Sequence, residues 1–193
     1  MIAITIPHSV VLGSVLCISI AWTPAQDKQN QEALVAMLAQ GNPDSEAIEK
    51  HRLTADNVRQ MFAVDRELFP LMKQVPDLER RADELARGID PQHRLGVVAV
   101  DAKAYEAIPE IAAILQRHRI SGREYMLTHL VAMVTAMADD TLTDEVLRHE
   151  GLNEIPPILM TPALKFWRSM DPALKAEAAE WKKMRGYDKG INR

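Results

Sequence analysis

An aspartate stands in the middle of the apolar face of one predicted helix. The helix expected over residues 55–74 carries its hydrophobic side chains on a single stripe: Val58, Met61, Phe62, Leu68, Phe69 and Met72. Asp65 lies seven residues from both Val58 and Met72, which places its carboxylate in that stripe. Because an unpaired buried charge is far costlier than a neutral polar group, Asp65 must have a partner, and Arg123 is the first candidate. A structural anchor is favoured over a pocket acid or a ligand-binding residue.

A histidine and two methionines share one face of a second predicted helix. Met126, His129 and Met133 follow i, i+3, i+7 spacing, so all three side chains point to one side of it. Thioether and imidazole groups bind cuprous copper, a soft ion, which makes a metal site one interpretation. The favoured interpretation is a core in which the methionines fill irregular space and the histidine makes one hydrogen bond. We therefore expect no cofactor.

A polar cluster at one end of this second helix is the remaining candidate for chemistry. Asp65, Arg123 and His129 are the candidate ligand-binding residues, and Glu124 joins them in the alternative of an enzyme or a metal-binding protein. The chain has no Glu-x-x-His pair, no His-Glu-x-x-His motif, no glycine-rich phosphate loop and no Gly-x-Ser-x-Gly elbow. A protein without catalytic residues is therefore favoured.

The elements that must position these side chains are all predicted to be helices. No convincing run of residues alternates with a period of two, as a half-buried strand would. Thr54, Ser121, Thr161 and Asp171 stand where helix N-caps are expected, and Gly88 stands where a helix should end. Ser121 and Glu124 have the spacing of a capping box.

The helix over residues 122–138 is predicted to be the centre of the fold. Its polar residues fall on one narrow stripe: Glu124, Thr128, Thr135 and Asp139. The rest of its circumference is apolar, and such a helix is buried among other helices. We predict an all-α, single-domain bundle of about six to eight helices around it, with Trp167 and Trp181 packed on the bundle.

The first 26 residues contain no Asp, Glu, Lys or Arg. Residues 10–21 form an apolar run that is followed by small residues, as in a secretory signal peptide. We predict a signal peptide over residues 1–25, a helical domain over 26–185 and a flexible tail over 186–193. Cleavage after Ala21, or none, stays open, because no basic residue precedes the apolar run. A spanning helix needs about 20 apolar residues, so a stable membrane span is not expected.

Composition restricts the chemistry of the mature chain. Cys17, the one cysteine, leaves with the predicted signal, which excludes disulfides, zinc-thiolate sites and a cysteine nucleophile. The formal net charge of −4 is modest, and the basic residues are dispersed, so no nucleic-acid partner is expected.

Two segments resemble a group of uncharacterised, exported, all-helical bacterial proteins. Residues 53–68 match its Leu-Thr-capped helix, and residues 120–128 match its Ser-x-Arg-Glu-Tyr start to an apolar helix. The resemblance implies a bacterial envelope or secreted setting and no known activity.

These observations predict a periplasmic or secreted helical module that is not an enzyme. Its expected partner is a small apolar ligand or another envelope protein. The methionine-rich face of the central helix would adapt to such a ligand if it opened to a cavity.

Overall fold

The computed structural model describes residues 43–90, 95–149, 155 and 160–187. These residues form nine α-helices and no strand. In chain order the helices are α3 (Ser45–Lys50), α4 (Ala55–Gln74), α5 (Asp77–Ile89), α6 (Val97–Ala107), α7 (Pro109–Arg117), α8 (Gly122–Thr141), α9 (Asp144–His149), α10 (Pro162–Ser169) and α11 (Pro172–Arg185). The predicted all-α, single-domain bundle is confirmed, although the described residues form nine helices where about six to eight are predicted.

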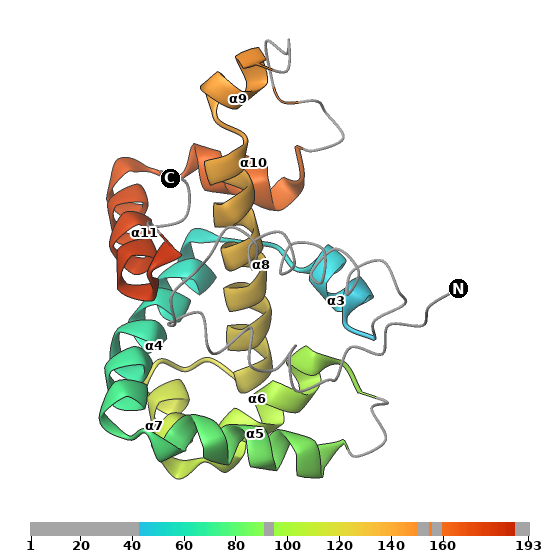
Figure 1. The fold of residues 1–193 in the computed structure, drawn as a ribbon, viewed down its shortest axis with the longest axis vertical. Coiled ribbons are helices and arrows are strands. Elements are labelled where there is room, and N and C mark those ends of the chain that lie inside the picture. Colours follow the sequence, from blue (N-terminus) through green and yellow to red (C-terminus); the bar gives the residue numbers. More distant parts are fainter. Residues whose placement is uncertain (1–42, 91–94, 150–154, 156–159, 188–193) are drawn as a thin grey trace.

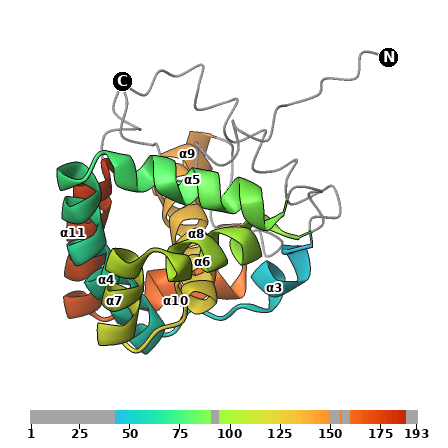
Figure 2. The same cartoon turned by 90° about the horizontal axis from the view of Figure 1, so that it is seen from below.

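Helix α8 runs through the centre of the molecule, and α3, α4, α6, α7 and α10 all pack against it (Figures 1 and 2). It extends three residues beyond the predicted end at Ala138. Part of its polar stripe is also buried, where Thr128 contacts the residue just after α3 and Thr135 bonds within α8. The Thr128 hydroxyl lies 3.1 Å from Nε2 of His51, and the Thr135 hydroxyl donates to the carbonyl oxygen of Val131.

The predicted N-caps form, with one difference. Thr161 and Asp171 accept hydrogen bonds from the backbone of the third helical residue, as predicted. Ser121 accepts from Glu124 N, but the described contacts contain no reciprocal bond from the Glu124 side chain. The backbone N–H of Gly122 instead donates to Glu106 on α6, which satisfies another free amide of the first turn.

The predicted helix end at Gly88 is wrong. Helix α5 continues through this glycine to Ile89, and Asp90 is its C-cap. Glycine in an exposed helical turn costs only about 1 kcal/mol relative to alanine, and the packing of Ile89 against Ala86, Val100 and Ala104 outweighs it.

The aromatic side chains gather where α11 meets the bundle. Trp167 and Trp181 are both buried and meet edge to face, which confirms that they pack on the bundle. Tyr187, just beyond α11, is buried against Trp181 with ring centroids 5.3 Å apart.

Several predicted segments lie outside the described residues. They are the signal over residues 1–25, the start of the helical domain, and residues 188–193 of the tail. Within the described part of the chain, no helix combines the length and the apolar character needed to cross a membrane.

Candidate functional site

Asp65 is the centre of a buried polar cluster that joins three helices. Its side chain has no exposed surface. The Tyr125 hydroxyl on α8 donates to Oδ1 at 2.6 Å, and the indole N–H of Trp181 on α11 donates to Oδ2 at 2.5 Å. Arg185, also on α11, donates to Oδ1 at 2.5 Å, and its guanidinium lies 5.2 Å from the centre of the Phe69 ring. The carboxylate is therefore paired as well as hydrogen-bonded.

His129 completes this cluster. Its Nδ1 lies 3.2 Å from Oδ2 of Asp65, but the two atoms are not aligned for a hydrogen bond, so the contact is electrostatic. The imidazole ring meets Trp181 edge to face and is tilted against Tyr125. It is 4% exposed.

The charges of the cluster are fixed by its surroundings. Burial alone would raise the pKa of Asp65, but the Arg185 guanidinium, His129 and the Tyr125 hydroxyl outweigh burial and hold this pKa well below its usual range. Burial and the Asp65 charge raise the pKa of Tyr125 far above its usual value. At neutral pH the carboxylate therefore stays ionised and the phenol stays protonated. General acid–base catalysis is most effective when a pKa lies near the working pH, so these shifts favour a structural role for both groups.

The predicted partner of Asp65 was wrong. Arg123 is exposed in the first turn of α8, and no hydrogen bond or ion pair joins it to Asp65 among the described residues. Arg185, 120 positions from Asp65 along the chain, takes that place. Of the four residues in the predicted polar cluster, the structure brings together Asp65 and His129. Glu124 instead lies near His51: burial lowers the pKa of His51, and the negative charge of Glu124 partly opposes that shift.

Tyr125, Trp181 and Arg185 were not among the candidate site residues. Tyr125 and His129 are four residues apart on α8, and Trp181 and Arg185 are four apart on α11. Each pair therefore lies on one helix face, and the two faces converge on Asp65. In the sequence, this i, i+4 spacing of hydrogen-bonding and cationic side chains is the pattern that could have indicated partners for Asp65.

The predicted copper ligands share one buried face of α8. Met126 and Met133 belong to the main core together with their neighbours on α4 and α6, and His129 turns Nδ1 toward Asp65. Only Nε2 of the ring would remain for a metal. No group of three His, Cys, Asp or Glu side chains in the described part of the chain is placed to hold an ion. That observation does not concern thioether ligands, and copper binding stays a prediction.

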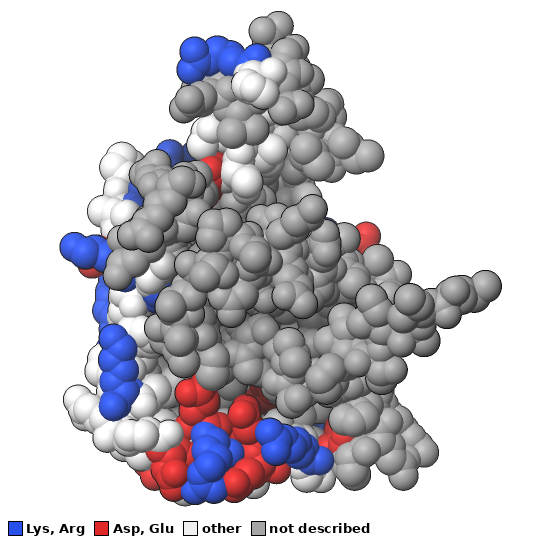
Figure 3. Space-filling model, viewed as in Figure 1, with Lys and Arg blue, Asp and Glu red and all other residues white. Residues whose placement is uncertain are grey.

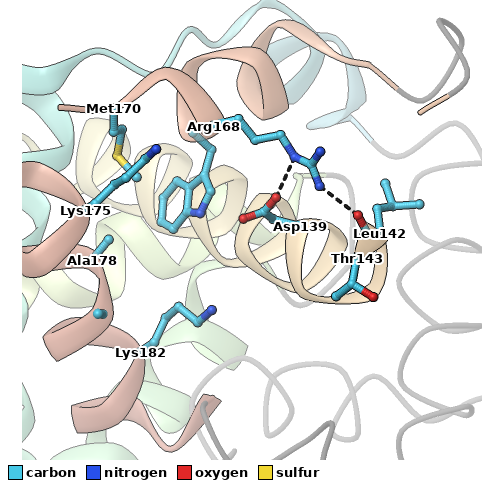
Figure 4. A pocket seen from close by; sticks show the side chains of 10 residues that line it. Asp139, Leu142, Thr143, Arg168, Met170, Lys175, Ala178 and Lys182 are labelled. Carbon is cyan, nitrogen blue, oxygen red and sulfur yellow. Dashed lines mark hydrogen bonds and ion pairs between the residues drawn. The ribbon is translucent and has the colours of Figure 1, made fainter. Parts of the chain in front are cut away.

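An accessible pocket lies where the C-terminal end of α8 faces α10 and α11 (Figure 4). Its volume is about 540 Å³. The lining residues are Asp139, Leu142, Thr143, Trp167, Arg168, Met170, Lys175, Ala178, Ala179 and Lys182. The sequence does not predict this pocket, because its walls come from three helices whose packing the local pattern does not specify.

The ionic groups of this pocket are mostly paired. Arg168 donates from Nε to Asp139 at 2.7 Å and from Nη2 to the carbonyl oxygen of Leu142 at 2.8 Å (Figure 4). Lys182 donates to Asp140 at 2.5 Å. Lys175 makes no ion pair with any described residue.

A second surface depression, of about 420 Å³, follows the exposed side of α5. Acidic and basic side chains alternate there, at the lower end of the molecule in Figure 3. Arg80 is held by both Asp77 and Glu84, with nitrogen–oxygen distances of 2.6 Å. Three carboxylates, those of Glu79, Asp83 and Glu84, line it against the two guanidinium groups of Arg80 and Arg87, so the depression has a small acidic excess.

Two buried aspartates surround the start of α6. Asp44 accepts a hydrogen bond from Val98 N at 2.8 Å and so takes the place of a side-chain N-cap, which Gly96 cannot provide. A Cβ at Gly96 would lie 2.1 Å from the Asp44 carboxylate, so only glycine fits. Asp101 is 2% exposed, and its Oδ2 has no hydrogen-bond partner among the described residues. Burial, with the nearby charges of Asp83 and Asp44, raises the pKa of Asp101 to about 7.

No protein family, no curated protein and no solved structure matches the chain. The described residues form an all-α bundle with a buried carboxylate anchor and an accessible pocket at the end of the central helix. The resemblance to exported helical proteins stays an expectation from the sequence.

Proposed function

We propose that the protein is an exported, non-enzymatic binding module whose small-molecule ligand lies in the pocket between α8, α10 and α11. One contrast carries the proposal. Asp65 and His129, the two residues of the predicted polar cluster that the structure brings together, are buried and held by structural contacts. The accessible space is lined by side chains suited to recognition.

The size of the pocket supports a small ligand. A volume of about 540 Å³ falls within the range of small-molecule sites, roughly 300–1,000 Å³. Trp167, Met170 and Ala178 are largely buried, but each presents an apolar edge to the pocket, and charged groups stand around it. The methionine face of α8, which the sequence suggested as the adaptable surface, is buried in the core. The pocket is thus the better candidate for the predicted ligand-binding surface.

A pocket-filling substitution tests this proposal. Ala179→Trp places an indole in the pocket from an exposed position of α11. Ala176→Trp adds the same side chain to an exposed position of α11 outside the lining and is the matched control. The probe is anilinonaphthalene sulfonate, an amphiphilic dye that fluoresces in partly apolar sites. We expect binding by the natural chain and by the control, and none by Ala179→Trp. Equal binding by all three would reject the pocket as the site.

Export is proposed from the sequence alone and has its own test. N-terminal sequencing of the protein recovered from the periplasm or medium of a bacterial host should give Gln26 as the first residue. Trp22 as the first residue would indicate cleavage after Ala21. Recovery in the cytoplasm with Met1 retained would contradict export.

One observation favours a second candidate, a copper-binding protein. Metal-ligating histidines commonly direct their other ring nitrogen to a carboxylate, as His129 does toward Asp65. Elemental analysis of protein purified under reducing conditions, compared with the Met126→Leu and His129→Gln variants, tests it. No bound copper in the natural protein would reject this candidate.

A further inference from the structure

The charges around the pocket suggest which ligands it selects. Three cations line it, Arg168, Lys175 and Lys182, against one carboxylate, that of Asp139. Figure 4 shows the two lysines on α11, with Arg168 and Asp139 on the elements that face it. The lining therefore has an excess of positive charge.

Pairing reduces this excess to a single group. Asp139 neutralises the charge of Arg168. The Leu142 carbonyl oxygen accepts a second hydrogen bond from the same guanidinium, so Arg168 is held in place at the edge of the pocket. Asp140, outside the lining, neutralises Lys182. Lys175 is left with a charge that no described carboxylate balances. A ligand anion would supply the missing partner without having to displace an existing ion pair.

The apolar part of the pocket has a defined place relative to this charge. Trp167 and Met170 belong to α10 and its C-cap, just before α11, and both line the pocket together with Lys175. A molecule with one anionic end and a short apolar body could thus contact the ammonium group and these apolar edges at once. A neutral molecule would leave the Lys175 charge without a partner.

We propose that the pocket binds a small organic anion, whose carboxylate or phosphate pairs with Lys175 while its apolar body covers Trp167 and Met170. This inference rests on the proposed function and adds the chemical class of the ligand. The anionic group can belong to a free metabolite or to a lipid headgroup, since both offer the same acceptor oxygens.

Three eight-carbon probes that differ in headgroup charge test the inference: octanoate, 1-octanol and octylammonium. Their affinities are measured by isothermal titration calorimetry or by displacement of anilinonaphthalene sulfonate. Octanoate should bind most tightly and octylammonium least. Lys175→Gln should weaken octanoate binding about fivefold, the upper range for an exposed ion pair. It should leave 1-octanol binding unchanged. Lys183→Gln, on an exposed position of α11 outside the lining, is the matched control and should change neither.

Each outcome has a separate meaning. Equal affinity for the three probes, or octanoate binding that Lys175→Gln does not weaken, overturns the anion preference and leaves the binding module intact. Failure of all probes and of the dye to bind overturns both proposals. Co-sedimentation with phosphatidylglycerol vesicles that Lys175→Gln abolishes assigns the anion to a lipid. Octanoate binding without such sedimentation assigns it to a free molecule.

Discussion

The free energy of unfolding should depend on pH through Asp101, and replacing Asp101 by asparagine should remove that dependence. In the folded chain Asp101 is buried, Oδ2 has no hydrogen-bond partner among the described residues, and the pKa is about 7 against an ordinary value of 3.8. The folded pKa is thus raised, so the folded chain binds a proton that the unfolded chain releases. The contribution of Asp101 to stability is fully present below about pH 3.8 and is lost as the pH rises through about 7.

The size of the effect follows from the two pKa values. A pKa difference of one corresponds to about 1.4 kcal/mol, so the step from 3.8 to about 7 has an upper limit of about 4 kcal/mol. Water that reaches the ionised carboxylate would reduce this figure, and about 2–4 kcal/mol is the expected range. Asparagine has a similar shape and no charge to desolvate. Its advantage over aspartate should therefore grow between about pH 4 and 7 and stay constant above that range.

Urea unfolding followed by circular dichroism measures this advantage. The natural chain, Asp101→Asn and Glu180→Gln, an exposed control on α11, are compared at about pH 5 and about pH 8. The difference in unfolding free energy between Asp101→Asn and the natural chain should be larger at the higher pH. The control should give the same difference at both. Parallel pH curves for the natural chain and Asp101→Asn would refute the reasoning, whatever the absolute stability of the variant.

Two further substitutions test the anchor and the close glycine contact. Asp65→Asn should lower the unfolding free energy by about 3–5 kcal/mol, because Arg185 would keep a buried charge without its partner. Arg123→Ala, the control, should change the unfolding free energy by less than about 0.5 kcal/mol. Similar losses for Asp65→Asn and Arg123→Ala in thermal unfolding would contradict the pairing of Asp65 with Arg185. Gly96→Ala should cost about 1–3 kcal/mol, since its Cβ would overlap the carboxylate beside it. Gly88 lies inside α5 with open space where a Cβ would stand, so Gly88→Ala should raise the unfolding free energy by about 0.5–1 kcal/mol. Urea unfolding in which Gly96→Ala is the more stable of the two variants would reject the reasoning.

Local features of the fold could be predicted from the sequence because their causes are local. Thr54, Thr161 and Asp171 cap helices through bonds to residues three positions away, and the apolar circumference of α8 is sufficient to place it at the centre. Gly88 failed as a stop signal, because the preference of a single residue is small beside the packing of a whole helix face.

The candidate site could be predicted only in part. The position of Asp65 on its helix indicates burial and a charged partner, and both are present. The identity of that partner depends on how α11 docks, which is a tertiary property with no local signature. Arg123 stands at the start of the predicted central helix, whereas Arg185 reaches the carboxylate from the far end of the chain. The accessible pocket also depends on how α11 docks, and the local sequence pattern therefore does not predict it.

The buried anchor and the accessible pocket are connected through α11. Trp181 and Arg185 attach one face of this helix to Asp65, and a rigid helix with one face fixed has a defined rotation about its axis. Lys182, adjacent to Trp181 in the chain, is thereby directed to the pocket, and Lys175, seven residues earlier, lies on the same side. Under the proposed function, the Asp65 carboxylate therefore contributes to recognition indirectly, because it sets the orientation of the helix that presents Lys175 to the pocket.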